Sequence, residues 1–419
     1  MIMKKLVLSL LLIASIAIQA QESEKKIKIK TYGFVGFDAF VDTRLSVTAR
    51  HNHVYLYPKK PNYDKNGVDM NDRSKFDFGA GNSRLGFAIS GPDAFGATTS
   101  AKIEGDFLGN GSGNDYLLRL RHAFLKLQWE KSSLLAGQTW HPFFVTENFP
   151  STVNFVCGAP IHPLSRAPQL KYTYQPNADL SLSIIALSQG DFKNTGALEQ
   201  VEMATPEMNV QLKYGSPKTF FLAATFGVKT QQPVTMDADS IYTNKNVTSL
   251  QANLSARYTF PALTIKAEGI YGGSMTNMVM IGGIARKTEG GEPINAEYTP
   301  IRTSSIWTDI HTNGKKVRFG VFGGVTHNLG TSDESTVVLI KDDEGNILID
   351  ETGYTRGSDI AYVYAIAPRV TFTSGKVKIG LEWMMTSAAY GEDIDENSKP
   401  IDTTEYTNNR ITLGMRYNF

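Results

Sequence analysis

The dominant pattern along this chain is an alternation of apolar and polar side chains with a period of two. Within residues 35–41 the odd positions are Val, Phe, Ala and Val, whereas Asp38 stands at an even position and Asp42 continues the polar series. A period of two places alternate side chains on opposite faces of a β-strand, whereas an amphipathic helix repeats every 3.6 residues. The pattern therefore predicts strands.

The alternation recurs along the chain to its last residue and predicts about 16 strands. Clear examples are the ranges 85–89, 101–107, 208–214, 220–226, 250–258, 263–267, 317–325, 377–383 and 411–419. We find no Pro/Ser-rich linker that would divide the chain into separate domains. The expected fold class is all-β, in one large domain.

Short and long connections alternate between these strands. The short ones are residues 90–96, 130–133, 175–179, 214–218, 260–262, 312–315 and 373–376. The long, polar ones are residues 43–75, 109–116, 141–166, 189–205, 230–246, 272–303, 328–359 and 389–408. An up-and-down outer-membrane barrel has this asymmetry, with short periplasmic turns and long extracellular loops, whereas a soluble sandwich has no reason for it.

Backbone hydrogen bonding then favours a closed barrel. An open sheet edge in hydrocarbon would leave N–H and C=O groups unpaired at a cost of several kcal/mol each, and closure removes every edge. The apolar side chains would face lipid and the charged ones a wet lumen, which in a 16-stranded barrel is too wide for side chains to fill. We predict a 16-stranded antiparallel transmembrane β-barrel around an aqueous channel.

The N-terminus is typical of a cleaved secretory signal peptide. Lys4 and Lys5 precede an apolar run over residues 6–18, and the small residue Ala20 follows. This run is shorter than the ~20 residues that a membrane-spanning helix requires. We therefore expect a signal peptide at residues 1–20 and a mature barrel over residues 21–419.

Composition excludes several other functions. The chain has 42 basic and 41 acidic residues, so removing Lys4 and Lys5 leaves it almost neutral, which gives no support to nucleic-acid binding. Cys157 is the only cysteine, which excludes an internal disulfide and a cysteine-based zinc site. His51 and His53 could hold a metal as a pair, but without a nearby acid or cysteine a solvated loop is the preferred interpretation. No cofactor is expected.

Two sets of residues resemble known outer-membrane proteins. The segment 410–419 resembles the C-terminal strand by which such barrels are delivered to their insertion machinery, with Phe419 as its aromatic terminus. The segments 83–87, 102–107, 119–124 and 136–140 are similar to the trimeric, DcaP-like branch of the gram-negative porins. The resemblance implies a homotrimer of 16-stranded barrels in the cell outer membrane, passing small and often acidic solutes.

The third long connection, residues 141–166, is a candidate constriction loop. General porins fold this loop inward to narrow the channel, and its content of Phe and Pro suits a compact, packed segment. A surface lid is the alternative. Glu147 is the only acid in the segment, whereas cation-preferring porins place several carboxylates there, so the segment favours anions.

The alternation also predicts which charged side chains line the lumen near this loop. Arg84, Arg119 and Arg121 would form a basic wall, which lowers the barrier for anions, unless they pair with acids on neighbouring strands. Strict alternation places His122 and Phe124 on the outer face. The predicted lining residues near this loop are Arg84, Lys102, Glu104, Asp106, Arg119, Arg121, Glu147, Arg166 and Lys171. The further basic residues expected to face inward are Lys213, Arg257, Lys266, Arg318, Arg410 and Arg416.

The expected function is passive diffusion of small, anionic solutes through an outer-membrane porin of a gram-negative bacterium. No G-x-S-x-G, H-E-x-x-H or C-x-x-C motif is present, and we expect no enzymatic activity. The alternatives are an accessory subunit of an uptake complex, an adhesin that uses the long loops, or a barrel enzyme with a Ser or Asp and a His at one rim.

Overall fold

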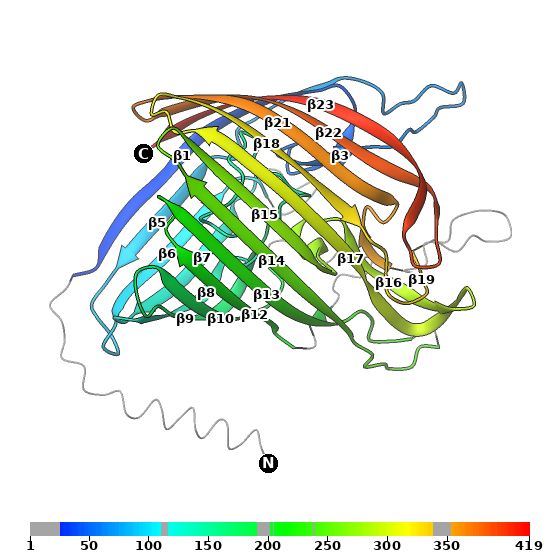
Figure 1. The fold of residues 1–419 in the computed structure, drawn as a ribbon, viewed down its shortest axis with the longest axis horizontal. Coiled ribbons are helices and arrows are strands. Elements are labelled where there is room, and N and C mark those ends of the chain that lie inside the picture. The colour runs from blue at the N-terminus through cyan, green and yellow to red at the C-terminus, as the bar shows by residue number, and fades with distance from the viewer. Residues whose placement is uncertain (1–25, 110–115, 191–201, 204, 238, 338–352) are drawn as a thin grey trace, which may run out of the picture.

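The computed structural model describes residues 26–109, 116–190, 202–203, 205–237, 239–337 and 353–419. It is a closed, antiparallel barrel of 16 strands, in which the N-terminal β1 (Lys28–Asp42) lies beside the C-terminal β23 (Pro400–Asn418) (Figure 1). The predicted fold class is confirmed. The predicted signal peptide, residues 1–20, lies outside the described residues.

The strands of the wall follow one another in chain order, and β4 and β5 share one position beside β1. Their bounds are β4 (Lys75–Gly79), β5 (Arg84–Ser90), β6 (Thr98–Asp106), β7 (Arg119–Gln128), β8 (Ser132–Trp140), β9 (Arg166–Tyr174), β10 (Leu180–Leu187), β12 (Glu207–Gly215), β13 (Phe220–Gln232), β14 (Val247–Thr259), β15 (Leu263–Gly273), β17 (Glu292–Thr312), β18 (Val317–Asn328), β21 (Ile360–Ser374) and β22 (Val377–Ile394).

Strand β1 closes the barrel. One edge pairs with β23, from Phe34 opposite Asn418 to Asp42 opposite Arg410. The other edge pairs first with β5 and then with β4. Because the ladder is continuous around the barrel, its backbone polar groups are satisfied in hydrocarbon without help from water.

The two faces of the wall have opposite polarity, as the alternation predicts. On β14, Leu250 and Leu254 are 57% and 62% exposed on the outside, whereas Gln251, Asn253 and Ser255 are buried inside. A soluble protein buries its apolar residues and exposes its polar ones. Here the apolar outer face matches a lipid environment, and the polar set lines the interior.

Two of the long connections contain more strand than the sequence predicts. The range 389–408 was expected to be a loop, but β22 and β23 stay paired up to Ile394 opposite Pro400. In the same way, β16 (Gly282–Glu289) and the start of β17 occupy most of the range 272–303. Beyond the apolar band the outward side chains need not be apolar, so the period-two signal ends although the hydrogen-bonded ladder continues.

Several long connections meet in an apolar cluster at the long-loop end of the barrel, which we call the loop core. They include the hairpin of β2 (Ser46–Ala49) and β3 (Val54–Pro58), the segment after the short helix η1 (Thr276–Met278), and the segment between β8 and β9. The buried members of the loop core are Val54, Leu56, Tyr57, Phe144, Val156, Ala159, Leu164, Val279, Ile281, Ile360, Val363, Ala388 and Tyr390.

Short strands complete the long-loop end. They are β11 (Glu202–Met203), β19 (Ser335–Thr336) and β20 (Gly353–Arg356), and the last two pair with β16. In the part of the chain that the structure describes, no helix is both long enough and apolar enough to cross a bilayer.

Candidate functional site

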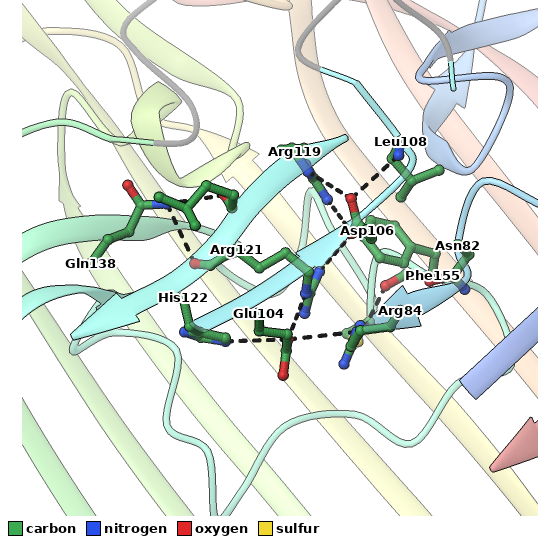
Figure 2. A network of polar contacts seen from close by, with 12 residues as sticks. Asn82, Arg84, Glu104, Asp106, Leu108, Arg119, Arg121, His122, Gln138 and Phe155 are labelled. Carbon is green, nitrogen blue, oxygen red and sulfur yellow. Dashed lines mark hydrogen bonds and ion pairs between the residues drawn. The ribbon is translucent and has the colours of Figure 1, made fainter. Parts of the chain in front are cut away.

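Four predicted lining residues form one buried ion network on β6 and β7 (Figure 2). Arg119 donates to both oxygens of Asp106, from Nε at 3.0 Å and from Nη2 at 2.7 Å. Arg121 donates from Nη1 to Asp106 at 3.0 Å and from Nε to Glu104 at 2.8 Å. All four side chains are almost completely buried. Arg119 and Arg121 are therefore paired with acids on the neighbouring strand, which was the alternative to a free basic wall.

A β-bulge puts two consecutive side chains of β7 inside the barrel. Glu104 pairs with His122 and Gly105 with Leu120, so Arg121 has no opposite residue. His122 is 3% exposed, and its ring centre lies 5.5 Å from that of Trp140. The extra residue of a bulge shifts the alternation by one position.

The prediction that His122 and Phe124 face outward is therefore wrong. Phe124 lines an internal cavity of about 500 Å³, and Leu125 takes the outward position with 51% exposure. Strict alternation cannot anticipate a bulge. The sequence gives one indication of the bulge, which is that the polar residues Arg121 and His122 are adjacent. In a strand without a bulge, one of the two would face lipid, which is energetically costly.

Basic groups outnumber acids around Glu104. Besides Arg121, Lys102 Nζ lies 3.2 Å from Glu104 Oε2, and Arg84 Nε lies 3.6 Å from Glu104 Oε1. Tyr32 donates its hydroxyl to the same carboxylate at 2.9 Å. One carboxylate thus faces three basic side chains, which leaves an excess of positive charge on this part of the wall.

Two further predicted residues, Arg166 and Lys171, lie on β9. The guanidinium of Arg166 is buried 4.6 Å from the ring centre of Trp140, in cation–π geometry. Lys171 lines the 500 Å³ cavity together with Lys126 and Lys213. Among the described residues, neither Lys126 nor Lys171 forms an ion pair.

The segment 141–165, between β8 and β9, lies inside the barrel. Its backbone and side chains bond to inward-facing groups of strands that are widely separated around the wall. Asn148 donates to the carbonyl of Ala267 on β15 at 2.9 Å. The N–H groups of Val153 and Asn154 donate to Glu382 on β22 at 2.7 and 3.0 Å. We call this segment the inner loop.

The only acid of the inner loop is neutralised. Glu147 accepts from Lys213 Nζ on β12 at 2.9 and 2.8 Å. Burial alone would raise the pKa of Glu147, but the charge of Lys213 and hydrogen bonds from Lys213 and Thr146 outweigh it, so the pKa is lowered. Glu147 therefore stays ionised, and its charge is balanced by its partner.

The structure adds Lys378 to the predicted inward-facing residues and places it opposite Arg416, which the alternation already put on the inner face. Lys378 on β22 and Arg416 on β23 stand directly opposite each other and line a cavity of about 460 Å³ beside the inner loop. Among the described residues, neither forms an ion pair. The alternation could have identified Lys378, because it lies between the outward-facing Val377 and the apolar Ile379.

The histidines of the first long connection do not converge on one point. His53 is fully buried, with Nε2 3.4 Å from Asp38 Oδ2, whereas His51 packs against the ring of Tyr116. The expectation of a solvated loop is therefore wrong for His53. Within the described ranges, no three His, Cys, Asp or Glu side chains gather closely enough to hold a metal ion.

Comparison with solved structures identifies the fold. The outer membrane channel DcaP of Acinetobacter baumannii superposes with a TM-score of 0.69 and 17% identity, covering 96% of this chain and 99% of that one. OmpT of Vibrio cholerae gives a TM-score of 0.55 with 10% identity, over 96% and 99% of the two chains. An anion-selective porin from Comamonas acidovorans gives 0.53 with 10% identity, over 94% and 100%.

The sequence itself carries the family assignment. No curated protein matches the chain. Residues 11–261, more than half of the sequence, match the DcaP outer membrane protein family. This match confirms the resemblance of the segments 83–87, 102–107, 119–124 and 136–140, all of which lie within the matched range. The chain belongs to the DcaP outer membrane protein family and is an outer-membrane channel of the porin type.

Proposed function

We propose that this porin lets small anionic solutes diffuse across the outer membrane, without enzymatic chemistry and without a cofactor. The observation that carries the proposal is the opposed pair of Lys378 and Arg416 on the cavity wall. Like charges placed directly opposite each other in a sheet are destabilising. A pair that costs stability and faces a water-filled passage is best explained by the solute that it attracts.

A third cation strengthens this site. The guanidiniums of Arg84 and Arg416 lie 5.0 and 5.1 Å from the ring centre of Phe34, so the same ring holds both of them near the cavity. Cations that line a narrow aqueous passage lower the barrier for anions and raise it for cations. The structural neighbour from Comamonas acidovorans is described as anion-selective, which agrees with this proposal.

The inner loop is the proposed constriction. It leaves the end of β8, bonds to β15 and β22 on other parts of the wall and returns to β9, and its one acid is paired with Lys213. A segment of this kind reduces the open cross-section without adding free negative charge. The passage would then be narrow where its walls are most positive.

The predicted lining residues have different parts in this proposal. Arg84, Lys102, Arg166 and Lys171 supply positive potential, whereas Glu104, Asp106, Arg119, Arg121 and Glu147 hold the wall and the inner loop in place.

The channel also needs partners for its assembly and export. A structure of Vibrio cholerae OmpT in a trimer form is similar to this chain, with a TM-score of 0.53. We propose a homotrimer in the outer-membrane lipid, exported by a signal peptide at residues 1–20. The insertion machinery would bind the last strand through Phe419, which is 46% exposed.

The test is the reversal potential of the purified protein in planar bilayers under a potassium chloride gradient. We expect a preference for chloride that falls at least about twofold in K378S/R416S, because two positive charges leave the passage. The matched control K65S/K131S removes the same charge from exposed loop and turn positions and should leave the preference unchanged. An equal chloride preference in the wild type and K378S/R416S would refute the role of this pair.

A further inference from the structure

One wall of the 460 Å³ cavity is made of stacked aromatic rings. The rings of Trp140 and Phe144 are nearly parallel, with centres 3.9 Å apart and an angle of 8° between their planes. Phe149 continues the stack, with its centre 5.3 Å from that of Phe144. All three rings line the cavity, and Trp140 and Phe149 are only partly buried.

The cations of the cavity belong to other parts of the barrel. Arg84 comes from β5, and Lys378 and Arg416 come from β22 and β23. Phe155 of the inner loop lies beside Arg84 and adds a fourth ring to the lining (Figure 2). Aromatic faces therefore meet two cations without an ion pair among the described residues, Lys378 and Arg416, and a third, Arg84, which shares Glu104 with two other basic side chains. The volume of the cavity lies within the range of small-molecule sites.

The chemistry of the lining selects among anions. A small inorganic anion needs several hydrogen-bond donors and gains nothing from apolar rings. The backbone N–H groups of Val153 and Asn154, which could have formed an anion nest, are already bonded to Glu382. Partly exposed rings in a wet lumen are instead stabilised by a flat, apolar solute that displaces water and stacks on them.

We propose that this cavity is a binding subsite for aromatic carboxylates, with the ring held against the Phe144–Phe149 stack and Phe155 and the carboxylate held by Arg84, Lys378 and Arg416. The inference rests on the proposed anion channel and names a substrate class for it. It requires no movement of the wall, since the rings and the cations already border the same space.

The experiment compares three carboxylates of equal charge in planar bilayers: benzoate, cyclohexanecarboxylate and acetate. Each is added to the wild-type channel in potassium chloride, and its dissociation constant is taken from the concentration that blocks half of the chloride current. We expect benzoate to bind about fivefold more tightly than acetate, with cyclohexanecarboxylate between the two, because its ring displaces water from the aromatic faces but cannot stack flat on them.

The variant F149L/F155L keeps apolar side chains but removes two rings. It should bind benzoate and acetate about equally while keeping the wild-type preference for chloride over potassium. F124L is the matched control, since Phe124 lines the other cavity, and it should keep the benzoate preference. The temperature at which each variant loses its folded electrophoretic mobility confirms that all of them form barrels.

The possible failures are distinguishable. Equal affinity of the wild type for benzoate and acetate, with chloride preference intact, would overturn the aromatic subsite and leave the anion channel standing. Binding of cyclohexanecarboxylate as tight as that of benzoate would overturn it as well, because bulk and not a flat ring would then be recognised. A wild type without chloride preference would instead refute the proposed function.

Discussion

Replacing Asp106 by Asn separates the structural charges of the lumen from those proposed to act on solutes. The carboxylate of Asp106 is fully buried and accepts hydrogen bonds from Arg119 at 3.0 and 2.7 Å and from Arg121 at 3.0 Å. Asparagine has nearly the same shape and keeps one acceptor oxygen. The substitution therefore removes one negative charge and leaves two buried guanidiniums with only Glu104 to balance them.

The expected loss of stability is large for such a small change. Removing one partner of a buried ion pair lowers the free energy of unfolding by about 3–5 kcal/mol, because the other charge stays buried without compensation. Because the amide oxygen of Asn still accepts a hydrogen bond and Arg121 keeps Glu104, we expect the lower end, about 3 kcal/mol in the free energy of unfolding. That corresponds to about a hundredfold change in the ratio of folded to unfolded protein.

D72N is the matched control. Asp72 lies 3.7 Å from Arg44, but its side chain is 73% exposed. An exposed pair of this kind contributes at most about 1 kcal/mol to stability. The two variants make the same chemical change, one inside the lumen wall and one on a surface loop.

The assay is urea unfolding of detergent-solubilised protein, followed by tryptophan fluorescence. D106N should unfold at a clearly lower urea concentration than the wild type, and D72N at nearly the same concentration. In bilayers D106N should also become more selective for chloride, because it loses a negative charge from the wall. Equal urea midpoints for D106N and D72N, or a D106N channel shifted toward potassium, would refute this account of the network.

Three further predictions follow from other parts of the lumen. E382Q leaves one acceptor oxygen for the N–H groups of Val153 and Asn154 and should increase the open-channel current noise, because the tip of the inner loop loses one of these two hydrogen bonds. Replacing residues 46–58 by a short Gly/Ser linker removes part of the loop core and should raise the single-channel conductance. Burial raises the pKa of Cys157 to about 11, so its thiol should react slowly with maleimide at pH 7 and about tenfold faster at pH 8, as measured by mass spectrometry.

The fold was predictable because the membrane imposes a simple rule on each strand. Outward positions face hydrocarbon and must be apolar over the whole span, so a run such as Leu250 and Leu254 carries a clear period-two signal. The rule fails where its cause is absent. Beyond the apolar band β22 and β23 continue as a paired hairpin, although the sequence there resembles a loop.

The site was harder to predict, because its contacts depend on where the strands and the inner loop meet. The bulge in β7 adds one residue to the strand and turns His122 inward. Strict alternation assumes that no residue is added, so it places His122 on the outer face. The bond between Val153 and Glu382 joins residues 229 positions apart, through a segment that crosses the lumen. Alternation can place Glu382 on the inner face, but it cannot show that a backbone N–H group will be its partner.

Net charge is a poor guide to the potential inside this barrel. The whole chain has a formal net charge of +1, which by itself predicts no preference between anions and cations. Inside, however, several acids hold arginines, lysines or the inner loop in place, whereas several cations keep no ion pair among the described residues. The paired acids include Asp42, Asp106, Glu147 and Asp309, and Glu382 bonds to the inner loop. The unpaired cations include Lys126, Lys171, Lys378 and Arg416.

This distribution makes selectivity depend on pairing and not on composition. An acid that is already bonded to a guanidinium contributes little negative potential a few ångströms away, whereas an unpaired cation beside a narrow aqueous passage contributes fully. Replacing a paired acid should therefore change both stability and selectivity, as expected for D106N. Replacing the unpaired cations in K378S/R416S should change selectivity with little loss of stability, because the substitution also relieves the repulsion between two opposed positive charges.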